Sequence, residues 1–321
     1  MRTFFLGEVL MRLEAPDHLR FIQTENFLSR YTGAELNSAV LMHCLGAKDL
    51  YLISAFPDNA LGEAALNAAR HWQIDTRCCI RKAGRLGLFF LEQGFGMRPS
   101  SVIYDRAGSV FAGSRFEDYD FENMFAPGDW LYVSGTMPAL SEKMPEFLKK
   151  VFSCAHRKEC MVCLDLNYRA NLWSWEKAAA VFTDLLNDVD ILLGNADLAR
   201  TMFQAEPSEL CTKFLLKNAA LTRRREENAD KNSCSGTLYD LDGGAFHSQT
   251  FSAAMLDRIG GGDAFGGAII YALQRNMPGQ AAIDFAVAAQ ILKQTIRGDV
   301  GLISQVDIQN FLSGREISVR R

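Results

Sequence analysis

The sequence lacks both an excess of positive charge and a long hydrophobic run. Its 321 residues include 34 lysines and arginines against 38 acidic residues, giving a formal net charge of −4. No cationic field is therefore available to hold nucleic acid or an anionic membrane. The longest mostly apolar stretch, residues 264–273, is much shorter than the ~20 residues that span a bilayer, and Glu8 interrupts a potential secretory signal. We predict a cytoplasmic protein that binds neither nucleic acid nor membranes.

Two well-known nucleotide-binding motifs are also missing. Neither GxxxxGKS nor GxxxxGKT occurs in the chain, which excludes a P-loop. The glycines at positions 260–262 do not follow the GxGxxG spacing of a dinucleotide-binding turn at a first strand. These absences disfavour a dinucleotide-dependent dehydrogenase.

Cysteine is present, but its spacing does not indicate a metal site. The eight cysteines are scattered at positions 44, 78, 79, 154, 160, 163, 211 and 234, which favours reduced thiols over a disulfide framework. Cys160 and Cys163 form one CxxC without a second ligand pair, inside a segment (CMVCLDL) that is typical of a buried strand. We interpret this CxxC as structural.

Composition and periodicity indicate an α/β fold. The chain is 48% hydrophobic, and short apolar runs alternate with helix-period segments, as in a parallel sheet covered on both faces. Asn195 and Ser208 occupy expected N-cap positions. The predicted strands are residues 50–54, 130–134, 161–166, 191–193 and 219–222, and the predicted helices are residues 35–45, 61–72, 141–154, 175–186 and 209–217.

Two parts of the chain break this alternation. Residues 81–116 contain the extended segments GLFFLE, SVIYDRAGS and VFAGSR, and residues 11–30 are similarly strand-like. We predict that they form a small antiparallel sheet that closes over a ligand or pairs with another subunit. Residues 223–232 (RRREENADKN) carry both signs of charge without an apolar period, so we predict a solvated loop. The alternative is that their arginines bind phosphate.

The most informative run is LDRIGGGDAFGGAIIYAL at residues 256–273. Gly260, Gly261 and Gly262 precede a small-residue helix, so their backbone N–H groups and the positive end of the helix dipole would attract a phosphoryl group. A carboxylate at Asp263 would repel that anion unless it had a role there. The role that fits is general base toward a hydroxyl that attacks phosphorus. The alternative is that Asp263 only caps the helix.

Together with other motifs, GGGDAF resembles the PfkB (ribokinase-like) carbohydrate kinases, and LDRIGGGDAF resembles their 2-keto-3-deoxygluconate kinase branch. The resemblance covers nearly the whole chain. Its further motifs are TGAELN (residues 32–37), PDNALG (57–62), GRLGLFFLE (84–92), VIYDRAGS (102–109), DLNYRANLW (165–173) and LKQTIRGD (292–299).

The resemblance implies one Rossmann-like αβα kinase domain over residues 1–321, with a mostly parallel sheet and a small β-sheet lid at about residues 11–30 and 81–116. It also implies a homodimer formed through the lids. Asp263 matches the catalytic base, and Gly260, Gly261 and Gly262 match the anion hole. Sugar-acid contacts match Gly33, Ala34, Asn37, Phe89, Tyr104, Arg106, Asn167, Arg169 and Asp299. ATP contacts match Asn195, Thr222 and Gly236, with Mg²⁺ bridging the phosphates; metal-binding residues and a monovalent cation requirement are left open.

The residues themselves support recognition of an acid. A keto sugar acid carries a carboxylate away from the reacting hydroxyl, and Arg106 and Arg169 offer planar donor forks suited to it. The alternative for each arginine alone is a surface ion pair. Tyr104 and Asp105 beside Arg106, and Asn167 beside Arg169, favour the binding interpretation.

The chain departs from the family pattern at four positions. Thr32 replaces a glycine of the sugar-binding pair, and Phe89 replaces a tyrosine. Leu198 replaces the glutamate of an NxxE segment associated with Mg²⁺, although Asp197 is adjacent. Arg297 replaces a proline without a clear functional meaning.

We predict an ATP-dependent kinase that phosphorylates the terminal hydroxyl of 2-keto-3-deoxygluconate or a close keto sugar acid. One alternative is a kinase of another sugar, either a neutral ketose or a deoxy keto acid, as Thr32 and Phe89 would allow. The other is a weakened relative that acts as a sugar-binding sensor, as Leu198 would allow.

Overall fold

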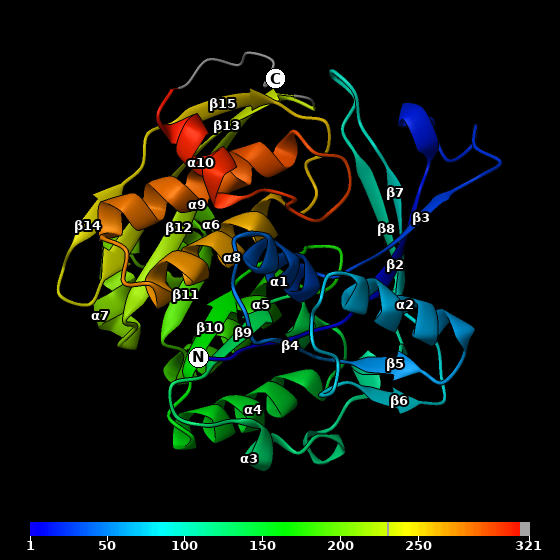
Figure 1. The fold of residues 1–321 in the computed structure, drawn as a ribbon, viewed down its shortest axis with the longest axis horizontal. Helices are drawn as coiled ribbons and strands as arrows, with labels where there is room; N and C mark the ends of the chain where they lie inside the picture. Colours follow the sequence, from blue (N-terminus) through cyan, green and yellow to red (C-terminus); the bar gives the residue numbers. More distant parts are fainter. Residues whose placement is uncertain (230, 315–321) are drawn as a thin grey trace.

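The computed structural model describes residues 1–229 and 231–314, and its centre is a large sheet (Figure 1). Among the described residues nine strands form this sheet. Neighbours from β12 to β4 run parallel, whereas β13, β14 and β15 are added antiparallel at one edge. In spatial order the strands are β14 (Ala245–His247), β13 (Lys231–Asp240), β12 (Asn218–Asn228), β11 (Ile191–Asn195), β10 (Met161–Asp165), β9 (Trp130–Ser134), β1 (Thr3–Leu6) and β4 (Leu50–Ile53), with β15 (Phe251–Ala254) pairing with β13.

Helices cover both faces of this sheet. Side chains alternate along a strand, so Phe5 joins the apolar cluster on one face, while Phe4 and Leu6 join the cluster on the other. The first face is packed by α1 (Ala34–Cys44), α2 (Ala60–His71), α8 (Gly261–Gln274), α9 (Gly279–Gln294) and α10 (Gln305–Leu312). The second is packed by α3 (Phe121–Met124), α4 (Met144–Arg157), α5 (Trp175–Leu185), α6 (Ala196–Phe203) and α7 (Leu210–Phe214).

The predicted αβα architecture is confirmed. The strand predictions at residues 50–54, 130–134 and 161–166 agree with β4, β9 and β10, because these runs are buried on both faces. In the described ranges, 1–229 and 231–314, we find no helix with the length and apolar character needed to cross a membrane.

A second, four-stranded sheet stands beside the main one (Figure 1). Its central strands β2 and β7 run parallel, so the prediction of a purely antiparallel sheet is wrong. The reason is that α1, β4 and α2 intervene between β2 and β7, so the chain re-enters this sheet in the same direction. Its strands, in order, are β3 (Leu28–Thr32), β2 (Leu10–Glu14), β7 (Leu88–Glu92) and β8 (Ser101–Asp105), and β5 (Ala55–Pro57) and β6 (Ile80–Lys82) form a separate pair.

The segment VFAGSR at residues 110–115 is not a strand as predicted. It forms a 3₁₀ turn at Phe111–Gly113, and Phe111 is buried in the core of the main domain. The Ser109 hydroxyl accepts a hydrogen bond from the Ala112 N–H, and this local side-chain bond favours a turn.

The prediction of a solvated loop at residues 223–232 is also wrong. Residues 223–228 belong to β12 and residues 231–232 to β13, and the two strands pair from Asn218 and Asp240 to Asn228 and Lys231; position 230 lies outside the described residues. Cys234 and Leu238 lie on the buried face of β13. The arginines of β12 remain exposed. Partner strands therefore override a charged composition that favours a loop.

The two predicted helix caps have different outcomes. The Asn195 side chain caps α6 by accepting a hydrogen bond of 3.0 Å from the Leu198 N–H. Ser208 instead lies inside a 3₁₀ turn, Pro207–Glu209, where Glu206 and Glu209 form a capping box. The predicted helix at residues 209–217 is accordingly limited to α7.

Candidate active site

A cavity of about 740 Å³ lies at the carboxyl ends of the main-sheet strands, between them and the small sheet. Asp165 and Asn195 reach it from the ends of β10 and β11, and Phe89 and Tyr104 line it from β7 and β8. The carboxyl edge of a parallel sheet is where α/β proteins bind their ligands. The start of α8 also opens into this space.

The turn before α8 requires glycine at Gly260. Its φ is +79°, and a Cβ there would lie 1.8 Å from the carbonyl oxygen of Asp299. Gly262 has open space where a Cβ would be and lines the cavity. The first N–H groups of a helix have no partner within the helix, so this end of α8 offers donors and a positive dipole end to an anion.

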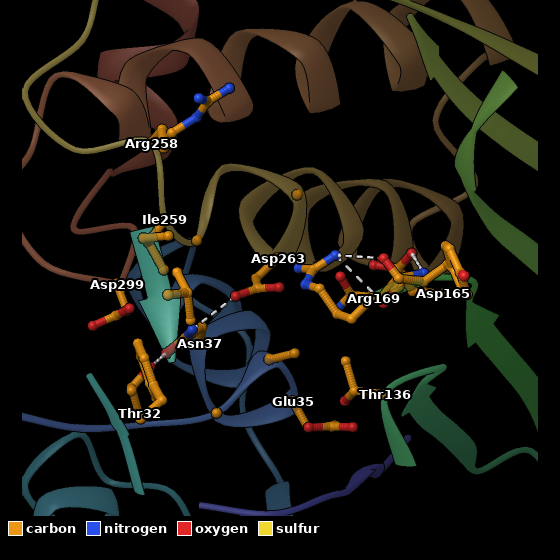
Figure 2. A pocket seen from close by; sticks show the side chains of 18 of the residues that line it. Thr32, Glu35, Asn37, Thr136, Asp165, Arg169, Arg258, Ile259, Asp263 and Asp299 are labelled. Carbon is orange, nitrogen blue, oxygen red and sulfur yellow. Dashed lines mark hydrogen bonds between the residues drawn. The ribbon is translucent and has the colours of Figure 1, made fainter. Parts of the chain in front are cut away.

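Asp263 lies in the first turn of α8 with its carboxylate facing the cavity (Figure 2). Its Oδ2 accepts a hydrogen bond of 2.7 Å from the Asn37 amide, whose Oδ1 in turn accepts one of 2.9 Å from the Thr32 hydroxyl. Burial raises the pKa of Asp263 to about 7, although the Asn37 hydrogen bond acts in the opposite direction. The N-cap of α8 is Gly260, so the geometry favours the general-base hypothesis over helix capping.

This hydrogen-bond chain also explains the departure at Thr32. The Thr32 hydroxyl fixes which way the Asn37 amide faces, so that the NH₂ group and not the carbonyl points to Asp263 (Figure 2). A glycine at position 32 could not make this contact. Thr32 therefore orients a neighbour of the candidate base.

Asp165 and Glu35 are buried acids that line the cavity and were missed in the sequence. Asp165 accepts hydrogen bonds from the Asn167 N–H and the Tyr132 hydroxyl, and burial raises its pKa to about 6. Glu35 of α1 accepts one of 2.9 Å from the Ser134 N–H, and burial raises its pKa to about 8. The place of Asp165 at the end of a predicted strand was a usable signal, whereas nothing distinguished Glu35 from a surface residue of a helix.

On the small-sheet side, Arg106 forms a buried ion pair. Its Nη2 and Nε lie 2.7 and 2.8 Å from the Oε2 of Glu8, and the Ser109 hydroxyl donates to the other Glu8 oxygen. Arg106 lies over the ring of Tyr104, which packs against Phe89. The arginine is thus not a surface ion-pair partner, and Glu8 already balances its charge.

Arg169 is more accessible. It is exposed, and its Nη1 donates to the carbonyl oxygens of Asn167 and Tyr168 at 3.4 and 3.1 Å. Figure 2 shows it between Asp263 and Asp165. The Asn167 side chain donates to the Ser134 hydroxyl at 2.8 Å. Arg169 therefore offers most of its donors to the cavity.

In the predicted nucleotide region, Asn195, Thr222 and Leu198 line the cavity. Gly236 does not: it lies opposite Thr222 in β13, and a Cβ there would lie 2.9 Å from Val287. This contact explains the glycine by packing. Asp197 pairs with Arg200 on α6 and does not line the cavity, so it does not stand in for the glutamate absent at position 198.

Most of the predicted site residues line the cavity, but Gly261 and Gly236 do not. Those that line it are Gly33, Ala34, Asn37, Phe89, Tyr104, Arg106, Asn167, Arg169, Asn195, Thr222, Gly260, Gly262, Asp263 and Asp299. Within the described chain no set of three or more His, Cys, Asp or Glu side chains is arranged to hold a metal ion.

A buried carboxylate beside a glycine-initiated helix, on an αβα fold with a second small sheet, is the arrangement expected of an α/β phosphotransferase. A family model described as pfkB family carbohydrate kinase matches residues 2–296, and the chain belongs to this family.

Individual proteins similar to this chain are also carbohydrate kinases. The chain is 28% identical over 321 residues to a 2-dehydro-3-deoxygalactonokinase of Haloferax volcanii, covering 98% of each chain. The structure of a 2-dehydro-3-deoxygluconokinase from Thermotoga maritima superposes with a TM-score of 0.93 at 33% identity, covering 98% of this chain and 100% of that one. A fructokinase from Vibrio cholerae, solved with fructose, ADP and calcium, shares the fold at a TM-score of 0.80 and 16% identity, covering 97% and 98%.

Proposed function

We propose that this carbohydrate kinase transfers the γ-phosphoryl group of ATP to the terminal hydroxyl of 2-keto-3-deoxygluconate or a close keto sugar acid. The observation that carries the proposal is the buried Asp263 carboxylate beside the glycine turn of α8, in a cavity that four arginines also line, Arg106 and Arg169 among them. The names of the Haloferax and Thermotoga relatives support the substrate class.

In this proposal Asp263 is the base. Its carboxylate takes the proton of the substrate hydroxyl as the oxygen bonds to the γ-phosphorus and the bond to the β–γ bridging oxygen breaks, releasing ADP. A pKa near 7 suits a base that must be ionised before the transfer and protonated after it. The N–H groups at the start of α8 would stabilise the charge that develops on the transferring group.

Recognition of the acid is assigned to the cavity arginines Arg169 and Arg106. Arg169 is exposed and suited to a bidentate contact with a carboxylate, and Arg106 contributes donors that Glu8 leaves available. Gly33, Ala34, Asn37, Phe89, Tyr104, Asn167 and Asp299 are proposed to shape the remaining sugar contacts.

The nucleotide is proposed to lie near Asn195 and Thr222, both on the cavity wall. Mg²⁺ is commonly held by substrate phosphates, waters and only one or two carboxylates. The cavity acid Asp165 fits that requirement as one such carboxylate, without a dedicated protein cage. A bound Mg²⁺ would neutralise part of the negative charge of the phosphates. We assign no nucleotide contact to Gly236, because its packing against Val287 explains why this position is a glycine.

We further propose that residues 1–321 form one kinase domain in which the small sheet is a lid. Its strands β2, β3, β7 and β8 lie within or next to the predicted ranges 11–30 and 81–116, and Phe89 and Tyr104 line the cavity from it. Exposed apolar side chains at Phe27, Leu28 and Ile103 favour pairing of two lids in a homodimer. The eight cysteines are all thiols and not disulfides, which suits a reducing compartment such as the cytoplasm.

A neutral ketose is the second candidate substrate. The observation that favours it is the Arg106–Glu8 ion pair, which leaves that part of the cavity without net charge. Phe89 also offers no hydroxyl.

A coupled ADP-release assay with Mg-ATP tests the proposal. The panel contains 2-keto-3-deoxygluconate, 2-keto-3-deoxygalactonate, 5-keto-2-deoxygluconate, fructose and ribose. We expect the highest kcat/KM for the first or second compound. A higher value for fructose or ribose would contradict recognition of an acid while retaining the kinase chemistry.

A further inference from the structure

A buried cluster of charged groups lies behind the glycine turn, centred on Arg12 of β2. The Arg12 side chain is fully buried. Its Nη2 lies 2.7 Å from the Oε2 of Glu14 and 2.9 Å from the Oδ2 of Asp257, and its Nη1 lies 3.0 Å from the Oδ1 of Asp299. One guanidinium thus contacts three carboxylates, two of which belong to distant loops.

Both loops build the candidate active site. The Oδ1 of Asp257 accepts the Ile259 N–H at 3.0 Å, one residue before Gly260, and its Oδ2 accepts the Gly298 N–H at 3.0 Å. The Asp299 carbonyl oxygen lies against Gly260, and its side chain lines the cavity. Lys293 of α9 also donates to the Asp257 carbonyl oxygen at 3.1 Å.

We propose that Arg12 is a positioning residue that holds the glycine turn in its reactive geometry by tying Asp257 and Asp299 to the small sheet. Arg12 does not line the cavity, so it acts through these two acids and not on a substrate. Arg12 donates a hydrogen bond to Asp257, whereas its contact with Asp299 is an ion pair. The planar fork of arginine suits this task because its separate nitrogens reach both acids, which the single charge of lysine does not.

The inference rests on the proposed kinase function, and it adds a link between the small sheet and the anion-binding turn. Arg12 lies in β2, between Leu10 and Glu14, and Leu10 lines the cavity. A displacement of β2 would therefore be transmitted to both the sugar cavity and the start of α8. The pair of Arg85 and Asp105 in the same part of the molecule is exposed and contacts neither loop, which makes it a matched control.

The first test compares Arg12→Ala, Arg12→Lys and the control Arg85→Ala by steady-state kinetics. We expect kcat to fall at least about tenfold in Arg12→Ala, with both KM values within about threefold, because a positioning contact acts on the transition state. Added guanidinium, but not urea or NaCl, should restore part of this kcat. Arg12→Lys should lose about three- to tenfold. Arg85→Ala should match the unaltered protein.

Two kinetic results would contradict the proposal. An unchanged kcat in folded Arg12→Lys would overturn it, and so would an effect confined to KM. Should Arg12→Ala be recovered unfolded, Arg12→Lys carries the decision, with its unfolding temperature measured in parallel.

Hydrogen exchange provides a readout that needs no sugar substrate. Amides of residues 258–264 and 297–300 should exchange faster in Arg12→Lys than in the unaltered protein, while β11 should be unchanged as an internal control. Equal exchange in both proteins would contradict the proposal. A protein that phosphorylates no member of the sugar panel but shows the expected exchange would refute the proposed substrate, not the role of Arg12.

Discussion

The two walls of the cavity treat buried charge in opposite ways. On the main-sheet wall, Asp263, Asp165 and Glu35 accept hydrogen bonds from neutral groups, an amide, a hydroxyl and backbone N–H groups. On the small-sheet side, Arg106 in the cavity wall and Arg12 behind it form close ion pairs with carboxylates. Burial raises the pKa of all three main-wall acids, to about 7, 6 and 8.

This difference separates two uses of charge. An acid whose hydrogen bonds come only from neutral groups pays a desolvation cost for its ionised form, and here that cost outweighs the opposing effect of the nearby arginines on the pKa. Such an acid binds a proton near neutral pH and suits proton transfer. An arginine held by carboxylates stays ionised and fixes the distance between two elements. The main-sheet wall therefore suits proton transfer, and the ion pairs on the small-sheet side suit positioning.

The largest effect should come from removing the candidate base on the main-sheet wall. Asp263→Asn keeps the size of the side chain but cannot take the proton, so kcat should fall by about 10²–10⁴-fold. ATP binding, measured by calorimetry, should change little. Asp197→Asn, an exposed acid of α6, is the control and should retain full activity. A kcat within a few-fold of normal in Asp263→Asn would remove Asp263 from this role.

Breaking the buried pair on the small-sheet wall should cost stability. Arg106→Leu leaves the Glu8 carboxylate buried without its cation, so the free energy of unfolding should fall by about 3–5 kcal/mol. The measurement is chemical denaturation. Arg85→Leu breaks an exposed pair and should cost less than about 1 kcal/mol. Similar losses in both variants would show that burial does not distinguish the two pairs.

Specificity for an acid should depend on the accessible arginine. Arg169→Leu removes a charged donor, worth about 1.5–3 kcal/mol, so kcat/KM for the keto acid should fall about 10–100-fold. The value for a neutral ketose should stay within about threefold. Equal losses for both sugars would mean that Arg169 does not recognise a carboxylate.

Activity should depend on pH through the main-sheet wall. The base acts only when ionised, and its pKa is raised to about 7, so kcat/KM should fall about tenfold for each pH unit below that value. Steady-state rates between pH 5 and 9 measure this. Glu35→Gln should keep the acidic limb, since it leaves Asp263 in place. A profile that is flat to pH 5 is incompatible with Asp263 as the base.

The smallest effect should come from the residue that orients the Asn37 amide. Thr32→Val deletes one hydrogen bond, worth about 0.5–1.5 kcal/mol, so kcat should fall about two- to tenfold. Thr201→Val, which removes an exposed hydroxyl on α6, should have no effect. A loss as large as that of Asp263→Asn would mean that Thr32 does more than orient Asn37.

Local patterns were sufficient for much of the fold. Runs such as residues 130–134 are apolar because both faces of a central strand are covered, and this is visible without knowing the neighbours. The prediction was wrong at residues 223–232 because a charged segment joins the sheet only when β13 pairs with it. The parallel pairing of β2 with β7 likewise depends on the path of the intervening chain.

For the site, the glycines and Asp263 could be predicted because contiguous residues form the start of one helix, and short-range geometry decides what such a turn can bind. Arg12 could not, because Asp257 lies 245 residues away and no local pattern marks either residue as the other's partner. The raised pKa values of Asp165 and Glu35 also arise from burial, which is a property of the packed molecule. The order of residues along the chain thus determines what the glycine turn can bind. Charge pairing and desolvation depend instead on which distant segments the fold brings together.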